Sequence, residues 1–227
     1  MSEPAGLHDT LRGAAWWPGL GPAQQERVLR EVEERRYSGG SVVMRKGESV
    51  EAWTGVIEGL VKINVVAASG KTATFTGVPA GGWFGEGSLL KGEPRKYDVV
   101  TLRDTRIAWM PRATFEWLLD SSIGFNRYLL VQLNERLGQF IGMVEFERLL
   151  APEARVARCL AELFNPHLYP GHAAEVAISQ EEIGYLSGVS RQRVNQALQV
   201  LERASLLQVD YGRIRITDLA GLRSYGG

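Results

Sequence analysis

Short segments rich in β-branched and aromatic residues follow one another between Tyr37 and Pro111. They end at or just before Gly, Ser-Gly, Pro or Asp, the residues that interrupt strands. This spacing predicts an all-β sandwich or barrel. Ser69 and Gly70, followed by Lys71, predict a hairpin turn between two of the strands. The predicted strands lie within 41–47, 53–59, 60–70, 72–78, 97–102 and 105–110.

Helical patterning flanks the predicted β region on both sides. Before it, Pro22 fits the first turn of a helix over 22–36, with Val28, Leu29 and Val32 on a partial apolar face. After it, the pattern predicts three more helices, over 111–119, from about 121 to 150, and over 152–164.

Apolar residues along the long predicted helix recur in steps that alternate three and four. This repeat is typical of the contact line of a coiled coil, in which two helices pair. We therefore expect this helix to form the interface of a homodimer. The alternative is that the same residues pack on the β region of their own chain. The predicted interface residues are Leu130, Leu133, Leu137, Phe140, Ile141 and Val144.

Residues 178–204 have the spacing of two short helices joined by a tight turn. Ser179 can cap the first helix, and Glu182, three residues later, completes a capping box. Gly188 stands where such a turn needs a positive φ, and Ser190 can cap the second helix. The expected buried positions are Ile183, Leu186, Val194, Leu198 and Leu201. This is helix-turn-helix spacing, in which the second helix lies in the major groove of DNA.

The outward residues of the second helix match the chemistry of base recognition. Arginine pairs with guanine, and asparagine or glutamine pairs with adenine, through two hydrogen bonds each. The hydroxyls of Ser179 and Ser190, together with the N–H groups of the helix starts, can hold phosphates. A solvated helix pair in a bundle is the alternative. The predicted base-reading residues are Arg191, Gln192, Arg193, Asn195 and Gln196.

Residues 206–217 follow as two short strands around Tyr211 and Gly212. A hairpin after a helix-turn-helix is a wing, and we expect Arg213 and Arg215 to contact the DNA backbone there.

Composition divides the chain into regions of different construction. All six tryptophans precede residue 118, and the break at Ala151-Pro152 separates the long helix from the one that follows. We expect an α+β fold with a β domain over 22–120, a long helix over 121–150 and a DNA-binding domain over 151–227.

The charge balance is neutral, with 26 Lys and Arg against 26 Asp and Glu. From Gly188 to Thr217, however, five arginines face one Glu and one Asp, a local excess of +3. Neutrality therefore does not exclude DNA but predicts weak non-specific binding. The single cysteine, Cys159, excludes an internal disulfide and a cysteine metal cluster. Without a secretory signal or an apolar run long enough for a membrane helix, the expected location is the cytoplasm.

Two segments carry a resemblance to the cyclic-AMP receptor protein/FNR (Crp/Fnr) superfamily of bacterial transcription regulators. The first is GVSRQRVNQALQVLE at 188–202, and the second is GGWFGEGSLLKGEPRKYDVV at 81–100, which resembles the family's phosphate-binding cassette. The resemblance implies an N-terminal cyclic-nucleotide-binding β-roll (a jelly roll), a dimerisation helix and a winged helix-turn-helix. It also implies double-stranded DNA and RNA polymerase as partners.

The resemblance assigns ligand roles to individual residues. Glu86 matches the family glutamate that meets the ribose hydroxyl, and Gly85 the glycine at the phosphate. Arg95 matches the arginine that pairs with the cyclic phosphate, for which its planar donor fork is suited.

Four positions depart from the family pattern. Lys96 replaces the usual hydroxyl residue after Arg95, and Tyr97 replaces a small one. Phe140 and Ile141 stand where the cyclic-AMP receptor protein contacts adenine through hydroxyls, so the hydrogen bonds that select that base are missing. We expect the effector to be a different cyclic nucleotide or a cyclic dinucleotide, or the regulator to need none. The alternatives are a regulator that depends on cyclic AMP and a regulatory nucleotide-binding module that does not bind DNA. Phe140 can stack on a base, and Glu86 paired with Arg95 in a pocket without ligand is a further alternative.

Other activities lack their residues. The family's iron–sulfur sensors need several N-terminal cysteines, which are missing here. A haem sensor needs an axial ligand, but His8, His167 and His172 lie in a tail and a loop. The chain has no P-loop, GxSxG or HExxH motif, so we do not expect an enzyme.

Overall fold

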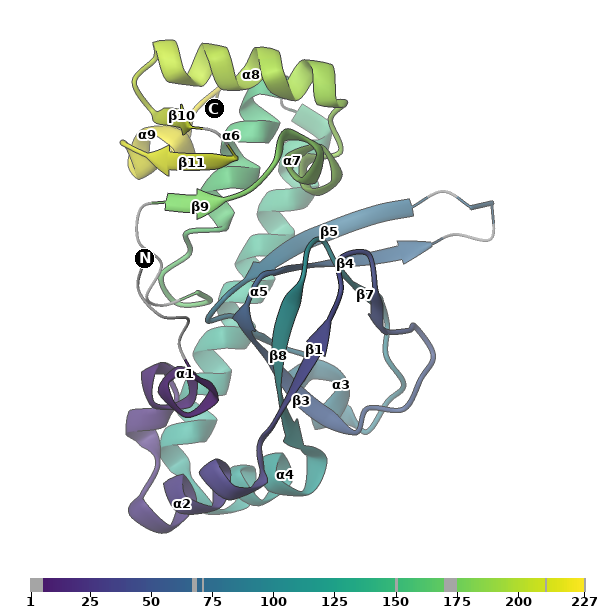
Figure 1. Ribbon diagram of the computed structural model, residues 1–227, viewed down its shortest axis with the longest axis vertical. Coiled ribbons are helices and arrows are strands. Elements are labelled where there is room, and N and C mark those ends of the chain that lie inside the picture. The colour runs from purple at the N-terminus through teal and green to yellow at the C-terminus, as the bar shows by residue number, and fades with distance from the viewer. Residues whose placement is uncertain are drawn as a thin grey trace.

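The computed structural model describes residues 6–66, 69–70, 72–149, 151–169, 175–210 and 212–226, with the backbone alone over 145–149. Lys71, Leu150, His172 and Tyr211, which entered the sequence predictions, lie outside these ranges. Within them, the fold is α+β, with an N-terminal β-roll, one long helix and a small C-terminal domain at one end (Figure 1).

The β-roll consists of two antiparallel sheets with strand orders β1-β8-β3-β6 and β2-β7-β4-β5. Apolar side chains from both sheets meet between them, among them Val56 and Ile107 from the first and Val61 and Val99 from the second. The sandwich prediction is therefore confirmed. The strand bounds are β1 Glu33–Tyr37, β2 Val42–Met44, β3 Ala52–Glu58, β4 Leu60–Val66, β5 Thr72–Pro79, β6 Trp83–Phe84, β7 Asp98–Thr101 and β8 Thr105–Pro111.

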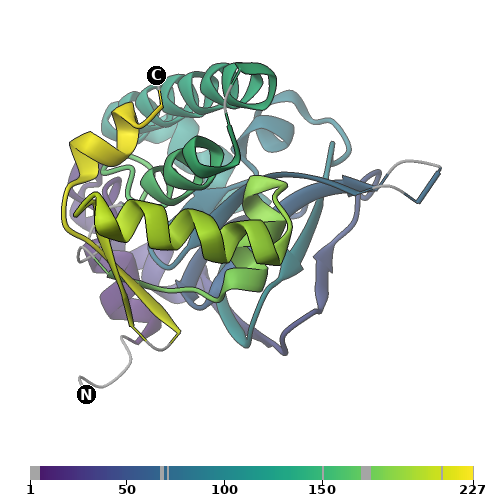
Figure 2. The ribbon, with the colours of Figure 1, turned by 90° about the horizontal axis from the view of Figure 1, so that it is seen from above.

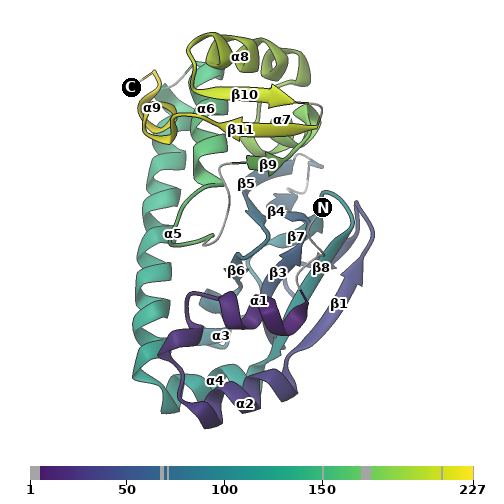
Figure 3. The same cartoon turned by 60° about the vertical axis from the view of Figure 1, so that its left-hand side comes forward.

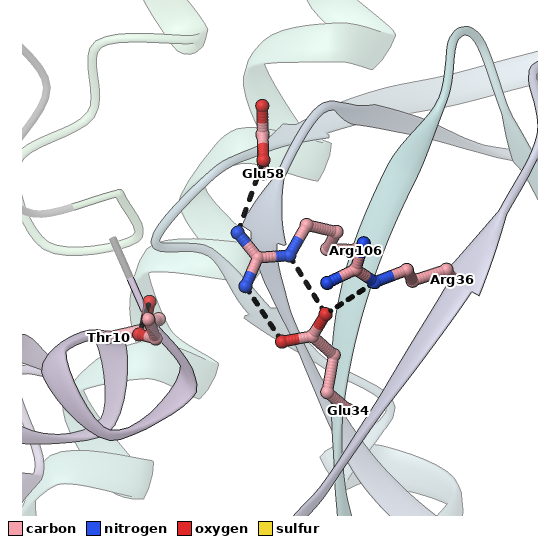
Figure 4. A network of polar contacts seen from close by, with 6 residues as sticks. Thr10, Glu34, Arg36, Glu58 and Arg106 are labelled. Atoms are coloured by element: carbon pink, nitrogen blue, oxygen red, sulfur yellow. Dashed lines mark hydrogen bonds and ion pairs between the residues drawn. The ribbon is translucent and has the colours of Figure 1, made fainter. Parts of the chain in front are cut away.

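The helix predicted over 22–36 is wrong at its C-terminal end. Helix α2 spans Pro22–Glu31, and the chain then continues as strand β1, which pairs with β8. Glu and Arg favour helices locally, but tertiary pairing overrides this preference. Arg106 of β8 donates to the Glu34 carboxylate at 2.8 and 2.9 Å, and Arg36 donates to the same group (Figure 4). Glu34 and Arg36 can both face Arg106 only because alternate residues of an extended strand lie on the same side.

An aromatic cluster fills the end of the roll that is covered by α1 (Leu7–Gly13), the 3₁₀ turn η1 (Trp17–Gly19), α2 and α4 (Arg112–Ser121) (Figure 3). The indoles of Trp53 and Trp83 lie 4.4 Å apart, and Trp16 contacts both. Gly55 admits Trp83, because a Cβ at position 55 would lie 2.5 Å from the indole. The cluster anchors the first turns of the long helix through Phe125.

Helix α5 (Ile123–Leu149) runs the length of the molecule and joins the two domains (Figures 1 and 3). Phe125, Leu129, Gln132 and Arg136 face the roll and are buried. Of the predicted interface residues, Leu133 is half-buried and Phe140 packs edge-to-face against Phe75 of β5. The others form an exposed apolar face on α5, made up of Leu130, Leu137, Ile141 and Val144.

In the described part of the C-terminal domain, the helices α6, α7, α8 and α9 pack on a three-stranded sheet of order β10-β11-β9. Its core contains Leu160, Ile183, Leu198 and Leu201, as the apolar spacing predicts for the last three. The element bounds are α6 Pro152–Glu162, β9 Glu175–Ala177, α7 Gln180–Ser187, α8 Arg191–Arg203, β10 Leu207–Asp210, β11 Arg213–Ile216 and α9 Leu219–Ser224.

Candidate nucleic-acid interface and anion pocket

The turn between α7 and α8 has the geometry that its sequence predicts. The Ser179 hydroxyl accepts from the Glu182 N–H at 3.2 Å, and the Glu182 carboxylate accepts from the Ser179 N–H at 2.6 Å, which completes the capping box. Gly188 has φ of 63°. Gly184 allows the close crossing, since a Cβ there would lie 2.9 Å from the Val189 carbonyl oxygen. The two helices are therefore held as a rigid helix-turn-helix.

Helix α8 separates its apolar and polar residues onto two faces. Val194, Ala197, Leu198 and Leu201 are buried against the domain core. Viewed from above, α8 lies across the outer end of the molecule (Figure 2). All five predicted base-reading residues are exposed on it, namely Arg191, Gln192, Arg193, Asn195 and Gln196.

Two contacts modify this polar surface. Asn195 accepts a hydrogen bond from Gln180 of α7 at 3.1 Å, which holds its amide in place. Ser190 occupies the N-cap position of α8, but its hydroxyl makes no capping hydrogen bond. Backbone N–H groups in the first turn of α8 are therefore free to donate hydrogen bonds to a phosphate.

The wing is present, but an acidic residue holds its two arginines. Strands β10 and β11 pair across Gly212, which has φ of 72°. Arg213 and Arg215 extend from β11 and donate to the carboxylate of Glu175 on β9 at 2.8 and 3.2 Å. These hydrogen bonds keep the pKa of Glu175 below its ordinary value. Glu175 lies outside the segment from Gly188 to Thr217, so the local excess of +3 did not include its negative charge.

The turn after β6 brings three predicted ligand residues together. Gly85 has φ of 96° and precedes helix α3 (Glu86–Lys91). Glu86 is buried and accepts a hydrogen bond from the Trp53 indole at 3.4 Å. Arg95 packs against the backbone of Gly85, because a Cβ at that position would lie 3.4 Å from its Nη1.

Arg95 is a buried cation that forms no salt bridge with the described residues. It is only 4% exposed, and its Nη1 has no hydrogen-bond partner among the described residues. Burial lowers its pKa, although the charges of Glu48 and Glu51 act to raise it, and a guanidinium stays charged at neutral pH. Glu86 accepts from Trp53, and Nη1 of Arg95 has no partner among the described residues, so the alternative pairing of Glu86 with Arg95 is not seen there. A buried unpaired arginine fits a phosphate oxygen.

Two other predicted ligand residues lie elsewhere. Lys96 is exposed and forms an ion pair with Glu93 at 2.7 Å. Phe140 contacts Phe75, and Ile141 is exposed on the outer side of α5.

Sequence reasoning did not assign roles to a polar group on the inner face of α5. Arg136 is buried and donates to the Trp83 carbonyl at 3.0 Å and to the Tyr169 hydroxyl at 2.9 Å. Gln132 donates to the same carbonyl at 3.1 Å and accepts from Tyr128. The signal in the sequence that could have identified this group is Arg136, a charged residue on the face of the long helix that otherwise carries the residues packed on the roll.

Over the described ranges, no group of His, Cys, Asp or Glu is arranged to hold a metal ion. None of the helices described there is long and apolar enough to cross a membrane.

Comparisons with known proteins match both domains. The model of the cyclic nucleotide-binding domain matches residues 34–122, and that of the Crp-like helix-turn-helix domain matches residues 154–225. The Cyclic AMP receptor protein of Thermus thermophilus is 26% identical over 212 residues, which is 92% of this chain and 95% of that protein. The Transcriptional regulator SdrP of the same organism is 28% identical and covers 74% of this chain and 80% of its own length.

The fold has solved counterparts. FixK2 from Bradyrhizobium japonicum aligns with a TM-score of 0.71 over 86% of this chain and 98% of its own, at 19% identity. This likeness concerns the order and arrangement of the roll, the long helix and the helix-turn-helix.

Proposed function

Because the chain belongs to the Crp/Fnr superfamily of transcription regulators, we propose that it acts as a homodimer that binds a near-palindromic operator in double-stranded DNA. The observation that carries this proposal is the polar face of α8. Five side chains able to pair with base edges are exposed on a helix whose opposite face is buried. Their helix is the outermost element at its end of the molecule (Figure 1).

The homodimer is supported by the exposed apolar face of α5. Leu130 and Leu137 are 68% and 58% exposed, one heptad apart on a helix that both domains share. An unpaired apolar stripe of this kind marks an interaction surface. Two copies paired about a two-fold axis along α5 present two α8 helices to DNA. The half-sites are then about one helical turn, roughly 34 Å, apart.

The roll is proposed to bind a ligand that carries a phosphate. The support is the buried Arg95 guanidinium, whose Nη1 lies beside Gly85 and has no hydrogen-bond partner among the described residues. We propose a cyclic nucleotide other than cyclic AMP, or a cyclic dinucleotide, because neither Phe140 nor Ile141 offers a hydrogen bond to adenine.

Control by cyclic AMP is the second candidate, favoured by the names of relatives such as the Cyclic AMP receptor protein. A regulator that needs no effector is the third. RNA polymerase is the expected protein partner of a regulator bound near a promoter.

Selection of bound duplexes from a randomised pool by the full-length protein tests the DNA proposal. We expect a two-fold symmetric consensus, and a mobility shift on that duplex with the stoichiometry of two chains. Recovery of no enriched sequence, with or without nucleotides in the binding buffer, would contradict the proposal.

A further inference from the structure

The two domains of one chain share their apolar cores. Leu168 and Tyr169, which follow α6, belong to the core of the roll and are about 1% exposed. Conversely, Leu60 of β4 belongs to the core of the C-terminal domain, and Leu102 packs against it. The helix-turn-helix is therefore seated on the roll of its own chain.

Tyr169 is held at three points. Its hydroxyl donates to the Gly77 carbonyl of β5 at 3.0 Å and accepts from Arg136 of α5 at 2.9 Å. Its ring lies over Gly82, where a Cβ would come within 2.8 Å of it. One side chain from the C-terminal domain thus contacts the roll and the long helix at the same time.

Arg103 makes a second connection between the roll and the C-terminal domain. It lies in the turn between β7 and β8 and donates to the Glu182 carboxylate through Nε at 3.0 Å and Nη2 at 2.6 Å. Glu182 is mostly buried and is also the residue that completes the cap of α7. The roll therefore holds the first helix of the helix-turn-helix by the residue that starts it.

Elsewhere in the domain contact the packing is incomplete. Leu163 and Leu186 contact β5 at Gly77, where a Cβ would lie 2.9 Å from Leu186. Beside them, a cavity of about 470 Å³ separates Thr74 and Phe75 of β5 from α6 and α7. Lys62 of β4 also lies over the Tyr185 ring of α7, 4.6 Å from its centroid. Because part of the domain contact is hollow, its geometry depends on such directional contacts, of which those at Tyr169 and Arg103 are hydrogen-bonded.

We infer that Tyr169 and Arg103 are positioning residues that set the placement of α8 relative to α5, and thereby the half-site spacing that the regulator reads. This inference rests on the proposed two-fold dimer. If α5 is the helix shared with the second copy, the separation of the two α8 helices depends on how each is held to its own α5. The domain contact leaves α8 itself exposed, so it orients the reading helix without covering it.

The test uses full-length Tyr169→Phe and Arg103→Ala. Tyr169→Phe keeps the ring that fills the space over Gly82 and removes only the hydroxyl. Affinity is measured by mobility shift on the selected operator, on versions with one to three base pairs inserted or removed between the half-sites, and on a duplex with a single half-site. Arg112→Ala is the matched control, because it removes an arginine whose ion pair with Glu116 lies within α4.

We expect the wild type and the control to prefer one spacing sharply. The two variants should lose on the order of tenfold in affinity for that spacing, because a loosely held second helix has a lower effective concentration at its half-site. Their affinities for altered spacings should come closer to that for the best one. Single half-site affinity should stay as in the wild type.

Three results would overturn the inference. Variants that keep the wild-type spacing profile show that the contacts do not position α8. Variants that lose the single half-site and all spacings equally show a structural role only, and their unfolding temperature would identify it. A wild type that selects no symmetric sequence contradicts the proposed function itself, which is a different outcome from an unaltered profile in the variants.

Discussion

Arg191 is the residue at which base recognition is most directly tested. It is exposed in the first turn of α8, the part of a recognition helix that reaches base edges. Arg191→Ala should weaken operator binding by about 1–3 kcal/mol and relax the preference at one base position. A mobility shift on operators changed at each position measures both effects. Arg203→Ala, at the far end of the same helix, is the control, and an unchanged base preference in Arg191→Ala would exclude the guanine contact.

Arg95 is expected to matter for ligand and not for folding. Arg95→Met keeps an unbranched side chain of similar length and removes a buried charge whose Nη1 has no partner among the described residues. The ligand-free unfolding temperature should therefore stay the same or rise. A cyclic mononucleotide or dinucleotide that raises the unfolding temperature of the wild type should raise that of Arg95→Met much less. If the ligand raised the unfolding temperature of both proteins equally, the phosphate would have to bind at a site other than Arg95.

Cys159 is expected to be chemically inert in the folded protein. Burial raises the pKa of its thiol to about 12, and Glu162 acts in the same direction. Since the thiolate is the reactive form, labelling by a disulfide reagent at pH 8 should be roughly a thousandfold slower than in the chain unfolded with guanidinium chloride. Fast labelling of the folded protein would instead point to a redox role.

Residues of the helix-turn-helix were predictable because their signals are local. Ser179, Glu182 and Gly188 lie within ten residues of each other, and caps and turns depend on such short spacings. The spacing also placed Arg191 on the exposed face. The partners of Arg136 were not predictable, because Trp83 and Tyr169 are 53 and 33 residues away along the chain.

At the scale of elements, the exposed face of α5 carries the homodimer. Leu137→Glu introduces a charge into the middle of that face, and a two-fold dimer would bring both copies of the charge together. We expect sedimentation velocity to show a dimer at least tenfold weaker, together with reduced operator affinity. Because Leu137 is exposed in the single chain, the helical circular dichroism signal of the Leu137→Glu protein should equal that of the wild type.

Leu90→Glu serves as the control, since Leu90 is an exposed leucine on α3, outside α5. A Leu137→Glu protein that remains dimeric at nanomolar concentration would place the interface elsewhere.

The elements show where periodicity succeeds and where it fails. The strands predicted over 41–110 and the helices predicted over 152–204 agree with the structure within a few residues, but β6, α3 and β9 in these ranges were not predicted. Strand β1 was predicted as a helix because EERRY contains good helix formers and no apolar alternation. Only the pairing with β8, 72 residues away, makes this segment extended.

For the whole molecule, neutrality predicts a weak dependence of DNA binding on salt. Glu175 compensates Arg213 and Arg215, so few cations remain for phosphates outside α8. Glu175→Gln should release both arginines. The plot of log affinity against log salt should then steepen by about one for each arginine that reaches a phosphate.

The expected companion effect of Glu175→Gln is tighter binding to random-sequence DNA. Glu116→Gln removes the same charge from α4, far from the wing, and should leave the slope as it is. An unchanged slope in Glu175→Gln would mean that the wing does not contact the DNA backbone.

The sequence predicts the order of the parts but not how they contact one another. The boundary near residue 150 follows from a proline and a change of pattern, whereas the seat of the helix-turn-helix depends on Gly77 and Gly82. Each of these glycines looks like an ordinary turn or strand residue until the side chain that it admits is known.

Shared cores also have a consequence for how the chain folds and evolves. The C-terminal domain completes its core with Leu60, and the roll completes its own with Tyr169, so neither reaches its full stability before the other has formed. Heat or urea should therefore unfold the chain in one cooperative transition. The helix-turn-helix is then not a self-contained module, and a chimera with a relative would have to carry the roll's glycines together with the tyrosine that fits them.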